Sequence, residues 1–129
     1  MESLEWTSEM VIGNEKVDRQ HHHLVDLVNE FLDAIRTGRS REDLEKVFNE
    51  LAFYTQTHFN DEEELFKETA YPHTDEHIQE HKDLIAQVVK LKEEYISGKK
   101  FISLSVFQFL RKWLRDHILE TDKKLAEYI

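Results

Sequence analysis

His117 interrupts the apolar side of a helix-like segment near the end of the chain. In "WLRDHILETD", the apolar residues Trp113, Leu114 and Ile118 follow helical spacing, and His117 stands where the next core residue is expected. Imidazole is a common ligand of transition metals, and a carboxylate, Asp122, follows five residues later. These residue types suit a buried site that binds a metal ion.

Three other segments also place histidines on their apolar sides. One histidine lies in the middle of the apolar stripe of residues 17–35. In the second segment a histidine and a glutamate, four residues apart, continue the stripe, and the third segment opens with two histidines at the same spacing. These candidates are His21, His58, Glu62, His77 and His81.

A single histidine on an apolar stripe is most often a core residue that is hydrogen-bonded to a neighbour. Five of them on four segments, together with a carboxylate, change that expectation. Burying the ionised carboxylate of Glu62 without a partner costs on the order of several kcal/mol, and no Lys or Arg shares these stripes. Because a multivalent cation neutralises the whole set, the sequence predicts a metal site.

Long periodic segments must position these side chains, and they cover residues 18–36, 40–67, 74–96 and 102–127. The 129 residues include only 3 Gly and 1 Pro, which favours long helices, and the short loops between them join antiparallel neighbours. We therefore expect one all-α domain over residues 1–129. It is an antiparallel up-down-up-down four-helix bundle over residues 18–127, preceded by an N-terminal arm, residues 1–17, that Trp6 anchors.

The candidate residues fall at matching heights in such a bundle. The histidines of the first and third helices lie near the starts of those helices, and those of the second and fourth lie near the ends. In an antiparallel bundle the starts of odd-numbered helices and the ends of even-numbered helices share one end. All the candidates should therefore meet at that end.

The bulk composition excludes several classes of protein. A formal net charge of −10 argues against nucleic acid and anionic membranes as partners, because both require a basic surface. The absence of Cys excludes disulfides, zinc–thiolate sites and iron–sulfur clusters. No apolar run approaches the ~18 residues of a membrane span, and the acidic N-terminus does not resemble a signal peptide. We expect a cytoplasmic protein with no membrane span.

Asp122 fits the helical spacing poorly. It lies five residues after His117, which is about 140° away on a regular helix, and Thr121 would face inward instead. Asp122 reaches the site if the turn is locally widened, as in a π-bulge, or if the metals lie near it and off the bundle axis. A solvated surface aspartate is the third alternative, and regular helix geometry favours it.

Taken together, the motifs resemble those of hemerythrins, most closely the bacterial single-domain kind. They are "D-x-x-H" at Asp18–His21, "HFNDEE" from His58, "YP" followed by "HIQEH" at His77–His81, and "W-L-x-x-H-I-x-x-x-D" at Trp113–Asp122. Each motif alone is weak, whereas their combined spacing is highly specific. In the family pattern the carboxylate five residues after the last histidine binds metal, so the resemblance implies that Asp122 is a ligand.

The resemblance implies a non-haem centre of two iron ions per chain, joined by an oxo or hydroxo bridge. By analogy, one iron is held by His77, His81 and His117, the other by His21 and His58, and both are bridged by Glu62 and Asp122. Counting these donors leaves one open position, on the iron with two histidines. The implied function is reversible binding of dioxygen for transport, storage or delivery, and delivery would require an oxygen-consuming protein partner.

Several neighbours of the centre have candidate roles. Leu114, one turn before His117, is the candidate wall of a dry oxygen pocket. Trp113, Phe59 and Ile118 complete that pocket or only pack in the core. Acceptors for the outer N–H groups of metal-bound imidazoles are also expected, and the candidates are Asp18 and Glu80, although a solvated surface carboxylate is the default interpretation of both.

Two other functions use the same ligands. A di-iron enzyme, such as a peroxidase or a nitric oxide or peroxide reductase, is the main alternative. The imidazole-rich set favours reversible binding, because more anionic donors would stabilise the high oxidation states that substrate oxidation requires. A sensor of oxygen or redox state needs an output domain, which we do not expect here. We therefore expect an oxygen-binding protein without catalytic residues, in which His22, His23 and His73 are not ligands.

Overall fold

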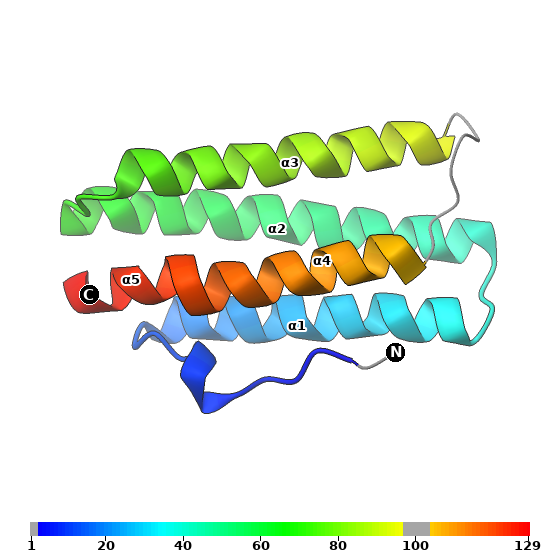
Figure 1. Ribbon diagram of the computed structural model, residues 1–129, viewed down its shortest axis with the longest axis horizontal. Helices are drawn as coiled ribbons and strands as arrows, with labels where there is room; N and C mark the ends of the chain where they lie inside the picture. Colours follow the sequence, from blue (N-terminus) through cyan, green and yellow to red (C-terminus); the bar gives the residue numbers. More distant parts are fainter. Residues whose placement is uncertain (1–2, 97–103) are drawn as a thin grey trace.

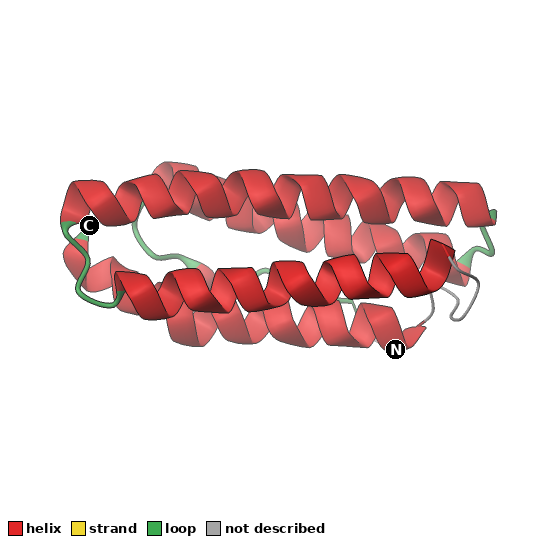
Figure 2. Cartoon of the chain, turned by 90° about the horizontal axis from the view of Figure 1, so that it is seen from above, coloured by secondary structure: helices red, strands yellow, loops and turns green. Residues whose placement is uncertain are grey.

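Long helices lie side by side along one axis in the computed structural model of the chain, which describes residues 3–96 and 104–129 (Figure 1). They are α1 (Glu15–Arg36), α2 (Arg41–Thr69), α3 (Thr74–Ile96) and α4 (Leu104–Asp116). The last helix continues through a π-helical stretch, η2 (His117–Asp122), then α5 (Lys123–Leu125) and a 3-10 turn, η3 (Ala126–Tyr128). Consecutive long helices run in opposite directions, and Figure 2 shows the same alignment from a second side. The predicted antiparallel four-helix bundle is confirmed.

Side-chain caps explain where the first two helices begin. The side chain of Asn14 accepts a hydrogen bond from the backbone N–H of Val17, so α1 begins at Glu15, earlier than the predicted residue 18. Ser40, the N-cap that "SRED" predicts, accepts from the N–H of Asp43 at 3.2 Å. Gly98, a glycine just after the third periodic segment and hence a candidate C-terminal stop, and the predicted start of the fourth helix at residue 102 both lie outside the described residues.

The apolar stripes of the helices form two separate clusters. The larger one fills most of the bundle and includes the fully buried Phe31 and Phe107. The smaller one closes one end and contains Val17, Phe66 and Leu125. Full burial of one such side chain contributes about 1.5–3 kcal/mol, so both clusters stabilise the bundle. Along α1, for example, His21 falls between Val17 of the smaller cluster and Leu24 of the larger one.

The N-terminal arm runs beside α1 (Figure 1) and is fixed at several points. The backbone N–H and carbonyl of Leu4 both form hydrogen bonds of 2.8 Å with the side chain of Asn29. Leu4 and Met10 are buried, whereas Trp6 is half-buried and contacts His22. The arm therefore has apolar anchors that the sequence analysis did not single out, Leu4, Met10 and Ile12, and Trp6 is more exposed than any of them.

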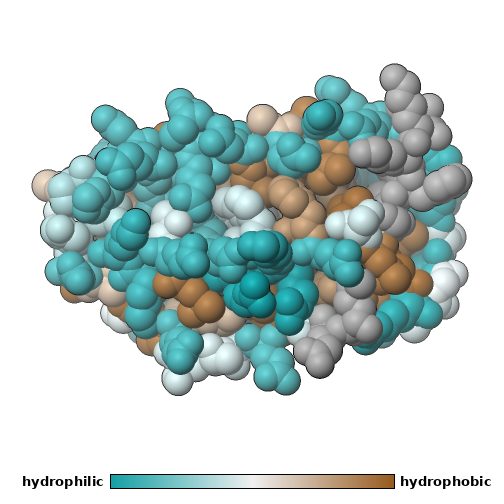
Figure 3. All heavy atoms as spheres, in the orientation of Figure 1, coloured by the Kyte–Doolittle hydropathy of each residue, from teal (hydrophilic) through white to brown (hydrophobic). Residues whose placement is uncertain are grey.

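The surface of the bundle is mostly hydrophilic on the face seen in Figure 3. Hydrophobic residues reach this surface between α3 and α4. Within residues 3–96 and 104–129, no helix is long and apolar enough to cross a membrane.

Candidate metal centre

All the residues that the sequence singled out as ligands lie together in one buried layer. They come from α1 (His21), α2 (His58, Glu62), α3 (His77, His81) and η2 (His117, Asp122). Each is between 0 and 3% exposed. The layer lies near the starts of α1 and α3 and the ends of α2 and the last helix, which is where the matching heights predicted that the side chains would meet.

A widened turn brings Asp122 into this layer. The residues from His117 to Asp122 form a π-helical segment, which holds one more residue per turn than an α-helix. As a result Asp122 Oδ1 lies 3.1 Å from His117 Nε2, and Asp122 is fully buried. Thr121, which regular spacing would turn inward, instead donates its hydroxyl to Glu80 at 2.9 Å. Of the three alternatives for Asp122, the structure has the widened turn.

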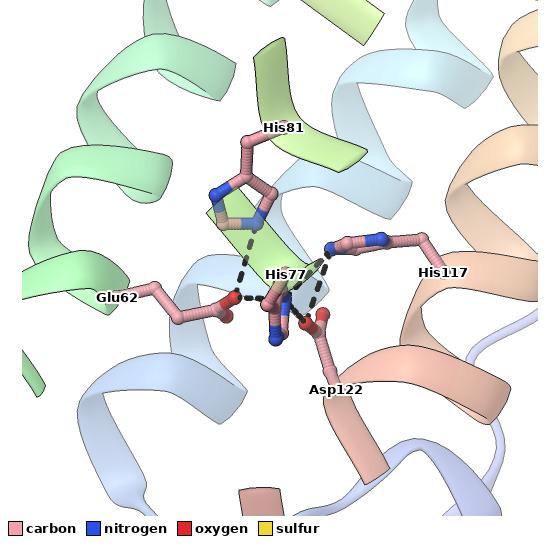
Figure 4. A group of neighbouring side chains, drawn as sticks. All are labelled: Glu62, His77, His81, His117 and Asp122. Carbon is pink, nitrogen blue, oxygen red and sulfur yellow. Dashed lines mark hydrogen bonds and ion pairs between the residues drawn. The ribbon is translucent and has the colours of Figure 1, made fainter. Parts of the chain in front are cut away.

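The carboxylates of Glu62 and Asp122 are in contact with imidazole nitrogens, and Figure 4 shows those of His77, His81 and His117. The oxygens of Glu62 lie 2.8 Å from His77 Nε2, 3.2 Å from His81 Nε2 and 3.3 Å from His58 Nε2. Asp122 lies 2.8 Å from His77 Nε2 and 2.9 Å from His21 Nε2. Every one of these imidazoles therefore directs Nε2 toward a shared carboxylate.

The donor atoms divide into two overlapping groups. In each group the candidate ligand atoms lie within 4.8 Å of one another. One group is Glu62, His77, His81, His117 and Asp122, and the other is His21, His58, Glu62 and Asp122. Both carboxylates belong to both groups. The layer can therefore accept two cations that share Glu62 and Asp122.

The donor atoms of the layer do not satisfy one another's hydrogen-bonding capacity, as is expected of atoms that bind metal ions. Both oxygens of Glu62 and of Asp122, together with Nε2 of His21 and His58, are buried without a well-aligned hydrogen bond. Nε2 of His77 and Nε2 of His117 approach each other at 3.3 Å, although only one of two neutral facing nitrogens could donate. Nitrogen and oxygen donors with no sulfur suit iron, and zinc or manganese could occupy the same ligands.

The electrostatics of the metal-free layer lead to the same conclusion. Burial alone would lower the pKa of His21 and of His117, but Asp122 opposes it and raises these values to about 9 and about 10. Burial works in the opposite direction on Glu62 and Asp122, yet the surrounding imidazoles hold the pKa of each carboxyl well below its usual range. Without a metal ion, the layer therefore retains protons as its compensating positive charge.

Groups outside the layer lie against the other nitrogen of three of the imidazoles, and two of these groups are within hydrogen-bond distance. Glu80 lies 2.6 Å from His117 Nδ1, and this contact is the first cause of the lowered pKa of Glu80. Glu63 lies 3.5 Å from His81 Nδ1. The partner of His58 Nδ1, at 2.7 Å, is Gln20. Glu80 was a predicted acceptor, whereas the sequence analysis missed the other two.

Asp18, the other predicted acceptor, has a different role. Its carboxylate accepts hydrogen bonds from the backbone N–H groups of Ile12 at 2.8 Å and Gly13 at 3.2 Å. Nδ1 of His21, which Asp18 was expected to hold, has no hydrogen-bond partner among the described residues. The candidate role of Asp18 as an acceptor for His21 is therefore wrong, because its carboxylate binds the backbone at the end of the arm instead.

The three remaining histidines lie on the surface. His22 and His23 are exposed, and His22 lies 3.4 Å from Asp26 on the same helix. His73 is exposed in the turn before α3 and faces Glu76 at 3.7 Å. None of them belongs to either group of candidate ligand atoms.

An apolar cavity of about 30 Å³ adjoins the layer. Leu114, Trp113 and Phe59 line it, as the oxygen-pocket interpretation requires. Ile118 does not; it is fully buried in the larger apolar cluster, so its role is packing. Thr55 also lines the cavity and was missed, although it continues the apolar stripe of α2 one turn before His58.

Two aromatic rings fix the planes of neighbouring imidazoles. Phe59 stacks on His81 with ring centroids 3.7 Å apart and planes within 5° of parallel. Trp113 stacks on His117 at 4.3 Å and 15°. Offset stacking of this kind restricts ring rotation, so these two side chains both border the cavity and orient candidate ligands.

Comparison with known proteins agrees with the fold and with the layer. Residues 12–129 match the family model described as the hemerythrin HHE cation binding domain. A bacteriohemerythrin of Stenotrophomonas maltophilia is 30% identical over 129 residues, covering 100% of this chain and 83% of the relative. A bacteriohemerythrin of Methylococcus capsulatus is 30% identical over 106 residues, covering 82% of this chain and 80% of the relative. A crystal structure of wild-type hemerythrin matches with a TM-score of 0.90 at 27% identity, over 96% of this chain and 95% of that one. The chain belongs to the hemerythrin family.

Proposed function

We propose that this chain binds two iron ions and, through them, binds dioxygen reversibly. In this proposal one ion is held by His77, His81 and His117, the other by His21 and His58, and both are bridged by Glu62 and Asp122. The two overlapping groups of buried donors support this division, and family membership supports iron as the metal.

The position of the apolar cavity is the observation that carries the proposal. The cavity is lined by both histidines of the smaller group, His21 and His58, but by only one of the three histidines of the larger group, His117. It therefore adjoins the group with fewer histidines, which has room for a further ligand. Its volume of about 30 Å³ suits a molecule no larger than one or two waters.

The chain's residues keep this position dry and ordered. When bound, a pair of iron ions supplies the two electrons that dioxygen takes up on binding and returns on release. Leu114, 6% exposed, and Phe59, 1% exposed, separate the cavity from water. Glu80 holds the imidazole of His117 from outside, and the hydroxyl of Thr121 donates to Glu80.

The lining of the cavity also favours binding over turnover. Outside the candidate ligands, its polar hydrogen-bonding groups are few, and the hydroxyl of Thr55 already donates to the backbone carbonyl of Leu51 at 2.7 Å. A peroxidase or a reductase needs a side chain that delivers protons to the bound substrate, and no carboxyl or amine beyond the candidate ligands lines this cavity. This makes a di-iron enzyme the second candidate.

Iron analysis combined with visible spectroscopy tests the proposal. We expect about two irons per chain and an absorption band that appears with dioxygen, disappears on its removal and returns on its readmission. Continuous consumption of dioxygen or peroxide in the presence of a reductant, without such a reversible band, would instead identify an enzyme.

A further inference from the structure

His58 differs from the other candidate ligands in the group that holds its outer nitrogen. His117 and His81 each face a carboxylate, from Glu80 and Glu63. His58 faces the side-chain amide of Gln20, at 2.7 Å from its Nδ1. Gln20 is itself only 9% exposed and lies on α1, so this contact joins α1 to α2 immediately behind the layer.

The partner of Gln20 determines which way its amide points. Nε2 of Gln20 donates to Asp61 at 2.8 Å, because a carboxylate can only accept. The carbonyl oxygen of Gln20 must then face His58, and an oxygen in that position accepts a proton from Nδ1. A reversed amide would place its oxygen against the carboxylate of Asp61, which is repulsive.

The orientation of Gln20 in turn specifies the tautomer of His58. With the proton on Nδ1, Nε2 carries a lone pair, and Nε2 is the nitrogen that faces Glu62 in the layer. The chain of contacts ends outside the core, where Asp61 lies 3.5 Å from Lys16. The negative charge is therefore two hydrogen bonds away from His58.

This arrangement gives the two groups of candidate ligands different surroundings. Behind the group that contains His77, His81 and His117, Glu80 lies at hydrogen-bond distance from His117, and a carboxylate in this position increases the electron donation of an imidazole bound to metal. Nδ1 of His77 and Nδ1 of His81 have no hydrogen-bond partner among the described residues, and Glu63 lies 3.5 Å from the latter. Behind His58 lies a neutral acceptor, and Nδ1 of His21 has no partner among the described residues. An ion held by His21 and His58 therefore receives less electron density from its imidazoles.

We propose that Gln20 and Asp61 are positioning residues that fix His58 in its metal-binding tautomer without placing a negative charge against its ring. The inference rests on the proposed function in one respect, since it assigns the consequence to the iron at which dioxygen would bind. A weakly donating imidazole disfavours the ferric state of that iron. The pair Gln20–Asp61 thus favours the reduced centre that reversible binding requires.

Two variants and a control separate the parts of this proposal. Gln20→Leu removes the acceptor. Gln20→Glu combined with Asp61→Asn keeps both hydrogen bonds, because the new amide donates to the new carboxylate, but it moves the negative charge next to His58. The control Gln56→Leu removes an exposed glutamine of α2 that, within the described part of the chain, donates to Asn60 at 3.0 Å and has no contact with the layer.

The first measurement uses metal-free protein and ¹⁵N NMR of its histidine rings. We expect His58 to carry its proton on Nδ1 in the wild type, in Gln56→Leu and in the double variant, and to lose this preference in Gln20→Leu. Zinc titration of the same samples should show a 10- to 100-fold loss of affinity at one of two sites in Gln20→Leu only. An unchanged tautomer in Gln20→Leu would overturn the role of Gln20 in positioning.

The second measurement is the reduction potential of the iron-loaded proteins. We expect the potential of the double variant to be lower than that of the wild type and of Gln56→Leu, because a carboxylate against His58 favours the ferric ion. An unchanged potential would overturn the charge part of the inference. Neither the NMR measurement nor the zinc titration requires dioxygen, so a protein that fails to bind dioxygen would refute the proposed function and leave these results interpretable.

Discussion

Replacing Glu62 with glutamine tests whether one carboxylate serves both metal positions. The substitution keeps the volume of the side chain and removes a charge that lies within 3.6 Å of Nε2 of His21, His58, His77 and His81. Loss of a residue that only orients a ligand typically costs 10–100-fold in metal affinity, so loss of a shared anionic ligand should cost at least about 100-fold at each position.

This loss of affinity converts into a measurable change in stability. A 100-fold weaker affinity removes about 2.7 kcal/mol of metal-dependent stabilisation per ion, or about 5 kcal/mol for two. At about 4 °C per kcal/mol for a domain of this size, the rise in Tm caused by metal should shrink by about 20 °C. Comparing Tm with and without metal for each variant cancels any effect of the substitution on the metal-free protein.

Calorimetry combined with metal analysis is the appropriate assay. We expect wild-type protein to bind about two ions per chain, and Glu62→Gln to bind fewer than one after dialysis. The matched control is Glu64→Gln on the same helix, since Glu64 is 68% exposed and forms an ion pair with Lys67 on the surface. If Glu62→Gln retained two ions and the full rise in Tm, the shared-carboxylate arrangement would be wrong.

Three further predictions follow from other contacts. The metal-free protein should lose stability, on the order of several kcal/mol, as pH rises from 6.5 to 10. In the folded protein the pKa values of His21 and His117 are raised to about 9 and about 10, whereas both are 6.5 in the unfolded chain. The stabilisation from these two histidines is therefore complete below pH 6.5 and is lost once the pH exceeds their pKa values in the folded protein. Urea unfolding of chelator-treated protein at several pH values measures this, and a stability that is constant over that range would contradict it. Leu114→Phe should fill the cavity of about 30 Å³ and lower the free energy of unfolding by about 1–3 kcal/mol, while the metal content stays the same. Stopped-flow experiments should then show slower association of dioxygen. An unaltered association rate would mean that dioxygen does not use this cavity. Asn29→Ala should remove both hydrogen bonds to Leu4, cost about 1–2 kcal/mol and speed proteolysis within the arm, whereas Asn60→Ala on the surface of α2 should leave the arm equally resistant.

The helical period of the apolar stripes is enough to predict which residues of each helix face the interior of the bundle. Helical spacing places His21 and His58 on inward faces and His22 and His23 on outward ones, and the structure has them there. The end of the bundle at which the candidate ligands meet also follows from sequence position, because antiparallel order fixes the relative heights of helices. Helix ends were predicted less accurately, because the N-cap at Asn14 starts α1 at Glu15 and not at residue 18.

Features that depend on contacts between helices could not be predicted in the same way. Gln20 lies at the border of the buried face of α1, so helical spacing alone does not tell which residues its side chain contacts. Its hydrogen bonds to Asp61 and His58 depend on how α1 packs against α2. Asp122 needed a local change of helix type that regular spacing opposes. The distinction between Leu114, which lines the cavity, and Ile118, which does not, depends on packing that a single helix does not determine.

The π-helical segment changes the helical phase of the residues that follow it, which is the direction in which each side chain leaves the helix axis. One surplus residue rotates the end of the chain by about 100° relative to an uninterrupted α-helix. In this phase Leu125 joins the small apolar cluster, and Lys123 donates to the backbone carbonyls of Glu9 and Val11 at 2.8 and 2.7 Å. A chain shortened by one residue between His117 and Asp122 would restore regular winding, but it would swing both contacts away from their partners. The winding that supplies a carboxylate to the interior thus also secures the two ends of the chain to each other.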